Sequence, residues 1–136
     1  MTPEPCSEEE RLMADPRFGE AVRLFNAAEW YACHDAFEEL WHESLDPCRR
    51  LLQGILQIAV AHVHLERGNL RGATVLLGEG LGRLQRAGTV DFGLDLAGLR
   101  QVAAARLLQL QKDADPAVLP LPELRSAVAV QTTDAP

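Results

Sequence analysis

The sequence predicts an all-α protein that folds into a single compact bundle of about five helices. Three observations support this fold class. Apolar residues recur at helical spacing over long stretches, and no stretch of useful length alternates between apolar and polar residues. The chain has 136 residues, of which 47% are hydrophobic and 24% are charged. One domain of this size can bury most of its apolar side chains in one core.

The first two predicted helices lie between residues 16 and 44. Asp15-Pro16 offers a helix cap followed by proline at the first helical position, which predicts a short helix through Phe25. A second helix is expected from about Glu29 to Ser44. Its apolar side consists of Trp30, Cys33, Phe37, Leu40 and Trp41.

The third predicted helix begins after Asp46-Pro47, which repeats the cap-and-proline signal, and it ends at Gly68. Its last two turns are apolar on most faces, so it should be the central helix.

The fourth predicted helix follows Asn69, which can cap it, and ends near Gly88. Glycines interrupt it, and each costs roughly 1 kcal/mol relative to alanine if it stays helical. The sequence therefore predicts either close helix packing or a local break at 78–82. The glycines concerned are Gly72, Gly78, Gly80 and Gly82.

A fifth amphipathic helix is expected at 96–112, after a turn region at 88–95. The predicted organisation is a flexible acidic N-terminus at 1–14, a bundle at 15–113, and a proline-containing strap or disordered tail at 114–136.

A weak internal similarity relates residues 28–41 to residues 68–81. It aligns Trp30 with Leu70 and Phe37 with Leu77, as in tetratricopeptide-type helix pairs. Two copies are fewer than a repeat array normally needs, so this resemblance stays weak.

Charge and composition argue against several classes of partner. The net charge of −7 opposes nucleic acid and anionic lipid headgroups, and no basic run is present, so neither nucleic acid nor a membrane is an expected partner. No secretory signal or membrane-length apolar run is visible. The odd number of widely spaced cysteines, Cys6, Cys33 and Cys48, indicates reduced thiols in a cytoplasmic protein.

Two polar stripes stand out on the second and third predicted helices. His34, Glu38 and Trp41 lie within roughly 40° of one another on the first of these helices. Gln53, Gln57 and His64 share a similarly narrow stripe on the second. Because a short turn joins the helices, they should pack antiparallel and can bring the stripes together. Buried amides and imidazoles need partners, so a hydrogen-bonded cluster is the structural hypothesis.

This cluster has three interpretations. In the first, the side chains pair with one another and form a polar core that fixes the register of the helices. In the second, they line a pocket for a small molecule or a metal. In the third, the two stripes never meet and their side chains are solvated.

Recognised chemical motifs are all incomplete. Glu39 and His42 form one E-x-x-H, but a di-iron site needs a second. His34-Asp35 resembles the dipeptide of metal-dependent phosphohydrolases, yet no earlier histidine exists to complete that ligand set. Cys33 and His34 are adjacent, so they diverge by about 100° on a helix and form a poor dyad. The sequence predicts no metal site and no cofactor.

A longer pattern runs through the chain at Phe25, Asn26, His34, Asp35, Glu38, Trp41, Gln53, Gly54, Gln57, His64, Gly68, Asn69, Gly72 and Ala73. The order and spacing of these residues, over about 18–87, resemble the domain of unknown function 309 (DUF309) family of small bacterial and archaeal helical proteins. Asp35 stands where the family usually carries glutamate. The resemblance implies an all-helical bundle and supplies no activity. It points to the same stripes, adds Asn69, and leaves out His42 and His62.

Two functional classes follow. The favoured one is a non-catalytic module that binds a protein or a small ligand between helices, through a candidate pocket or polar cluster. The alternative is a metal-dependent or hydrolase-like enzyme in which His34 and Glu38 act as acid and base. A homo-oligomer is compatible with either class. The candidate residues are His34, Glu38, Trp41, Gln53, Gln57, His64 and Asn69.

Overall fold

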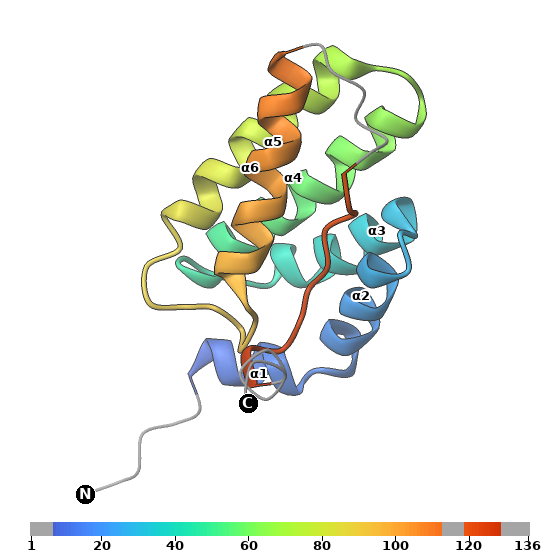
Figure 1. Ribbon diagram of the computed structural model, residues 1–136. Coiled ribbons are helices and arrows are strands. Elements are labelled where there is room, and N and C mark those ends of the chain that lie inside the picture. The colour runs from blue at the N-terminus through green and yellow to red at the C-terminus, as the bar shows by residue number, and fades with distance from the viewer. Residues whose placement is uncertain (1–6, 113–118, 129–136) are drawn as a thin grey trace, which may run out of the picture.

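The computed structural model describes residues 7–112 and 119–128, and in these residues it contains six α-helices and no strand. The all-α prediction is therefore confirmed, with one helix more than expected. Figure 1 shows the helices packed side by side. They are α1 (Glu8–Ala14), α2 (Pro16–Asn26), α3 (Trp30–His42), α4 (Cys48–Glu66), α5 (Leu70–Gln85) and α6 (Leu96–Gln111).

The additional helix is α1, in a segment that the sequence analysis expects to be flexible. Ser7 caps it by accepting a hydrogen bond from the Glu10 amide. The Glu9 carboxylate also accepts hydrogen bonds from the backbone amides of Asp91 and Phe92, both at 2.8 Å. Acidic residues in the first turn therefore stabilise α1 in two ways, through the helix dipole and by attaching it to a distant loop.

Helix α4 is the centre of the bundle, as its apolar sequence predicts. It packs most extensively on α5 and next on α3, and most of its side chains are buried. Asp46 does not cap it as expected, since the N-cap residue is Pro47 and no side-chain hydrogen bond caps this helix. The Asp46 carboxylate instead accepts a hydrogen bond from Arg50.

Glycines allow α4 and α5 to approach each other closely. A Cβ placed on Gly80 would lie 2.9 Å from the Gly54 carbonyl oxygen, and one on Gly54 would lie 3.1 Å from the Gly80 carbonyl oxygen. Helix α5 runs without a break through 78–82. The expected break is therefore absent, and the expected close helix packing holds at Gly80, whereas Gly78 has, among the described residues, no heavy atom of another helix nearer than 4.0 Å to its added Cβ.

Residues 119–128 form a strap along the bundle, drawn in red in Figure 1. The Asn26 side chain, at the end of α2, exchanges two hydrogen bonds with the Leu124 backbone, at 2.7 and 3.0 Å. The strap also pairs with the segment before α6 through an isolated bridge between Leu94 and Ser126. Of the expected C-terminal region at 114–136, residues 119–128 alone are described, and 114–118 and 129–136 lie outside the described part of the chain.

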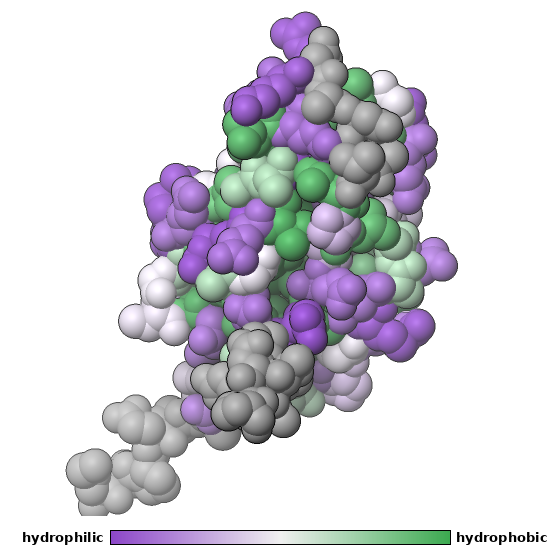
Figure 2. All heavy atoms as spheres, viewed as in Figure 1, coloured by the Kyte–Doolittle hydropathy of each residue, from purple (hydrophilic) through white to green (hydrophobic). Residues whose placement is uncertain are grey.

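The face that carries α6 and the strap shows apolar surface between hydrophilic flanks (Figure 2). In the described ranges, no helix combines the length and the apolar character that a membrane span requires. Cys33 and Cys48 are buried free thiols, as expected for reduced cysteines; Cys6 lies outside the described residues.

Candidate functional site

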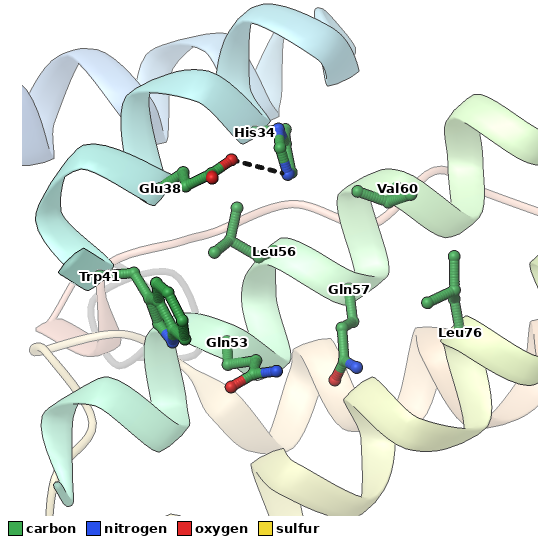
Figure 3. Close-up of a pocket in the computed structure, with 8 residues that line it drawn as sticks. All are labelled: His34, Glu38, Trp41, Gln53, Leu56, Gln57, Val60 and Leu76. Atoms are coloured by element: carbon green, nitrogen blue, oxygen red, sulfur yellow. Dashed lines mark ion pairs between the residues drawn. The ribbon is translucent and has the colours of Figure 1, made fainter.

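A pocket of about 210 Å³ opens between α3, α4 and α5. Figure 3 shows His34, Glu38 and Trp41 projecting from α3 toward side chains of α4, with Leu76 contributed by α5. The pocket therefore brings together five of the seven candidate residues. Its full lining is His34, Glu38, Trp41, Gln53, Leu56, Gln57, Val60 and Leu76.

The polar edge of the pocket is an ion-pair network on α3. His34 Nε2 lies 3.2 Å from Glu38 Oε2, one helical turn away. His34 Nδ1 lies 3.2 Å from Asp35 Oδ1, and His42 Nε2 lies 3.3 Å from Glu38 Oε1. The side chains of His34 and Glu38 are 30% and 43% exposed, so this network is open to solvent rather than sealed in the core.

Trp41 forms one wall of the pocket and is itself held in place. The Arg49 guanidinium lies over its indole ring, 3.9 Å from the ring centroid. The indole Nε1 atom is buried and has no hydrogen-bond partner in the part of the chain that the structure describes. This N–H group is sealed from solvent, so it is not available as a donor to a molecule in the pocket.

The amides of the second stripe do not pair with the histidines, which corrects the expected hydrogen-bonded cluster. Gln57 Nε2 donates to Glu79 Oε2, and Gln57 Oε1 accepts from Arg83 Nε, both at 2.9 Å. Gln57 thus joins α4 to α5. The predicted cluster used the polar stripes of the second and third predicted helices only, so it did not include the polar side chains of α5. Gln53 lines the pocket beside it (Figure 3).

His64 and Asn69 lie away from the pocket, so the expectation that they join His34 and Glu38 is wrong. Asn69 Nδ2 lies 3.2 Å from His64 Nδ1, and Asn69 Oδ1 accepts from the Gly72 amide to cap α5. The physical reason is axial: His64 follows Gln57 by seven residues, which is about 10 Å along a helix axis. The angles of residues around a helix do not show how far apart the residues lie along its axis.

A cysteine nucleophile is excluded next to this network. Cys33 is fully buried, and burial raises the pKa of its thiol to about 12. The thiol is therefore neutral at physiological pH, in agreement with the weak Cys-His dyad inferred from the sequence.

Three potential ligand groups do converge on α3. One donor atom each from His34, Asp35 and Glu38 lies within 4.8 Å of the others. Imidazole and carboxylate groups suit zinc and related divalent metals, although metal–ligand bonds near 2 Å would require these side chains to move closer together.

The apolar walls of the pocket and one histidine near it are not among the residues predicted from the sequence. Leu56, Val60 and Leu76 line the pocket but look like ordinary core positions in an amphipathic helix. His42 is not among the candidate residues predicted from the sequence, yet it contacts Glu38. Its i,i+4 spacing from Glu38 was the signal that could have identified it.

Residues 18–76 match the family model described as Domain of unknown function (DUF309). The match supports the resemblance to the DUF309 family that the sequence pattern indicates. The DUF309 match contains every residue that lines the α3–α4–α5 pocket, from His34 to Leu76. No curated protein matched the chain in a sequence comparison.

Proposed function

We propose that this protein is a non-catalytic binding module, and that its α3–α4–α5 pocket receives one cationic side chain of a partner protein. The observation that carries the proposal is the half-exposed Glu38 carboxylate at the edge of an otherwise mainly apolar pocket.

The carboxylate has capacity for a further hydrogen bond. Each Glu38 oxygen contacts one imidazole nitrogen, whereas an ionised carboxylate offers about four acceptor positions. The neighbouring Asp35 carboxylate is 77% exposed. A lysine ammonium or arginine guanidinium that reached this edge would find acceptors, and the net charge of −7 would attract it.

The dimensions of the pocket favour a single side chain. Its volume of about 210 Å³ lies below the roughly 300–1,000 Å³ of typical small-molecule sites. Leu56, Val60 and Leu76 can contact the methylene groups of a long cationic side chain while its charged end stays near Glu38.

The test compares two blocked amino acids that differ in charge. Nα-acetyl-lysine methylamide should bind the wild-type protein, and its norleucine counterpart should bind more weakly. Glu38→Gln should weaken lysine-probe binding by about tenfold, because it removes a charge-assisted hydrogen bond. Glu39→Gln is the matched control, since Glu39 is an exposed acidic residue next to Glu38 that does not line the pocket. Equal effects of the two variants would contradict the proposal.

A second candidate function, metal-dependent catalysis or metal binding, rests on the convergence of His34, Asp35 and Glu38. In that case the metal would polarise a substrate or activate water. Calorimetric titration of the purified protein with Zn²⁺ separates the two candidates. Stoichiometric Zn²⁺ binding that is lost in both His34→Ala and Glu38→Gln would favour the metal site. Binding of the lysine probe by a protein that does not bind Zn²⁺ would favour the binding module.

A further inference from the structure

The strap at 119–128 lies in a groove whose walls come from distant parts of the chain. It runs between α6 on one side and α2 and α3 on the other (Figure 1). Its side chains alternate as in an extended segment, because Pro122 and Leu124 are buried, whereas Leu121, Glu123 and Arg125 are exposed. Two side chains therefore anchor the strap in the groove.

The groove also holds the strap through its main chain. Asn26 Oδ1 accepts a hydrogen bond from the Leu124 amide at 2.7 Å, and Asn26 Nδ2 donates to the Leu124 carbonyl oxygen at 3.0 Å. Further along, the Ala127 amide donates to the Gly93 carbonyl oxygen at 2.9 Å. These contacts use atoms that every amino acid except proline carries, so they do not depend on the side chains of the strap.

Arg106, from α6, contacts the start of the strap in the same way. It is only 4% exposed, and its Nη2 atom donates to the Leu119 carbonyl oxygen at 3.3 Å. In sites that bind extended peptides, hydrogen bonds to the main chain supply affinity and pockets for alternate side chains supply specificity. The groove has both features.

The strap fills this groove incompletely. A strap pocket of about 330 Å³ opens beside it toward α3 and α4, and a further space of about 290 Å³ opens along α6. Leu121 lines both spaces, and it is 51% exposed. A larger apolar side chain at this position would bury more surface than Leu121 does. The strap pocket is lined by Trp30, His62, Leu65 and Arg106 of the bundle and by Leu119 and Leu121 of the strap.

We propose that this groove is a docking site for an extended segment of a partner protein, and that the strap occupies the site when the partner is absent. The segment carries the pattern of residues 121–124, which is a large apolar residue followed by Pro-x-Leu. Its proline and leucine replace Pro122 and Leu124, and its main chain pairs with Asn26. Its large apolar residue enters the space that Leu121 leaves open, which the strap of a second copy would fill no better than the chain's own strap.

This site goes beyond the proposed function, because it uses none of the residues that line the α3–α4–α5 pocket. The lysine probe and the experiments below therefore test the two sites independently.

The first experiment weakens the strap without changing the groove. A fluorescent peptide with the sequence of residues 119–128 is added to the full-length protein, and its anisotropy reports binding. Binding to the wild type should be weak, because the peptide competes with a strap tethered to the groove. Leu124→Ala truncates a strap side chain that is 3% exposed, so the peptide should bind this variant about tenfold more tightly. Equal affinities for the two proteins would overturn the proposal.

Two further strap variants make this result independent of how well Leu124→Ala folds. Ala127→Pro removes the amide that donates to Gly93, so it should also increase the affinity for the peptide. Leu121→Ala is the matched control, because Leu121 is half-exposed, and it should change the affinity much less. An affinity that rises in Leu121→Ala and in neither of the other variants would contradict the anchoring role of the buried residues.

The Asn26 contact has its own test. A peptide methylated on the amide nitrogen that corresponds to Leu124 cannot donate to Asn26 Oδ1. It should bind Leu124→Ala about threefold to tenfold more weakly than the unmodified peptide, the range expected for one neutral hydrogen bond. In Leu124→Ala that also carries Asn26→Ala, methylation should make no difference. An equal penalty in both proteins would show that the peptide binds outside the groove, and would overturn the proposal.

The nature of the occupant is tested last. A peptide that carries the Leu121→Phe change should bind Leu124→Ala more tightly than the strap sequence does, because phenylalanine buries more apolar surface. Weaker binding would overturn the preference for a larger side chain. Analytical ultracentrifugation of Leu124→Ala without peptide should show a monomer. A dimer that forms as the protein concentration rises would overturn the partner segment and assign the groove to the strap of a second copy.

Discussion

Glu38 and its neighbours show how a short helical segment acquires a concentrated polar surface. Two imidazoles, His34 and His42, lie one turn before and one turn after the same carboxylate. Helical geometry makes both contacts possible, because residues four apart lie on one face. These contacts are exposed and therefore contribute little to stability. Their main consequence is to present a charged edge beside an apolar pocket.

His62 provides a prediction about pH. Burial lowers its pKa from the ordinary value of 6.5, so the unfolded chain binds a proton at a higher pH than the folded protein does. Stability should therefore be fully present above about pH 6.5 and should fall as pH decreases toward the lower, folded-state pKa. Urea unfolding of wild-type protein and His62→Phe at a series of pH values measures this contribution.

The variant should show a shallower loss of stability below pH 6.5, because phenylalanine does not titrate. Identical pH profiles for the two proteins, or a His62 ring that titrates above 6.5 in nuclear magnetic resonance spectra, would contradict the buried neutral imidazole.

At the scale of residues, the polar side chains of the site could be predicted from the sequence, but their hydrogen-bond partners could not. His34, Glu38 and Trp41 could be selected because one helix determines their relative positions. The partners of Gln57, which are Glu79 and Arg83, come from a third helix. No pattern within α3 and α4 contains this information.

Among the elements, the contact between α4 and α5 depends on backbone atoms. Gly80→Ala would place a Cβ 2.9 Å from the Gly54 carbonyl oxygen, so the helices would have to move apart. We expect the free energy of unfolding to decrease by about 1–3 kcal/mol.

Gly78→Ala is the matched control on α5. Its Cβ would meet nothing closer than Leu107 Cδ2 at 4.0 Å, and alanine is the better helix former by about 1 kcal/mol. Gly78→Ala should thus leave stability unchanged or raise it. Denaturant unfolding measures both variants, and equal destabilisation by the two would contradict the close approach.

Helices α2 to α6 could be predicted from the sequence because apolar periodicity and terminal residues such as Asp15 and Asn69 are local signals. Helix α1 could not, because Glu9 stabilises it through a loop more than eighty residues away. The axial position of His64 was also missed, since a helical wheel shows angle alone.

Across the whole molecule, the strap joins segments that are distant in sequence. Asn26 and Leu124 form a reciprocal pair of hydrogen bonds between side chain and backbone. Asn26→Ala should therefore increase hydrogen exchange at the Leu124 amide and lower stability by about 1–2 kcal/mol. Asn26→Asp keeps the oxygen that accepts from this amide, so it should preserve more of the protection. Unchanged exchange in Asn26→Ala would show that the strap is held by other contacts.

The arrangement of the strap and of the two pockets could be predicted only in part. Prolines in the C-terminal region indicate a non-helical segment, but they do not specify which groove it occupies. The α3–α4–α5 pocket could be anticipated from facing polar stripes. The strap pocket could not, because it combines His62 with Arg106 and residues of the strap.

The central claim is that the α3–α4–α5 pocket holds a cationic side chain, and intermolecular nuclear Overhauser effects test it most directly. With Nα-acetyl-lysine methylamide, the lysine methylenes should show contacts to the methyl groups of Leu56, Val60 and Leu76 in wild-type protein and in Glu39→Gln. These contacts should weaken strongly in Glu38→Gln. Lysine contacts to methyl groups elsewhere on the bundle, with none to these three residues, would contradict the account.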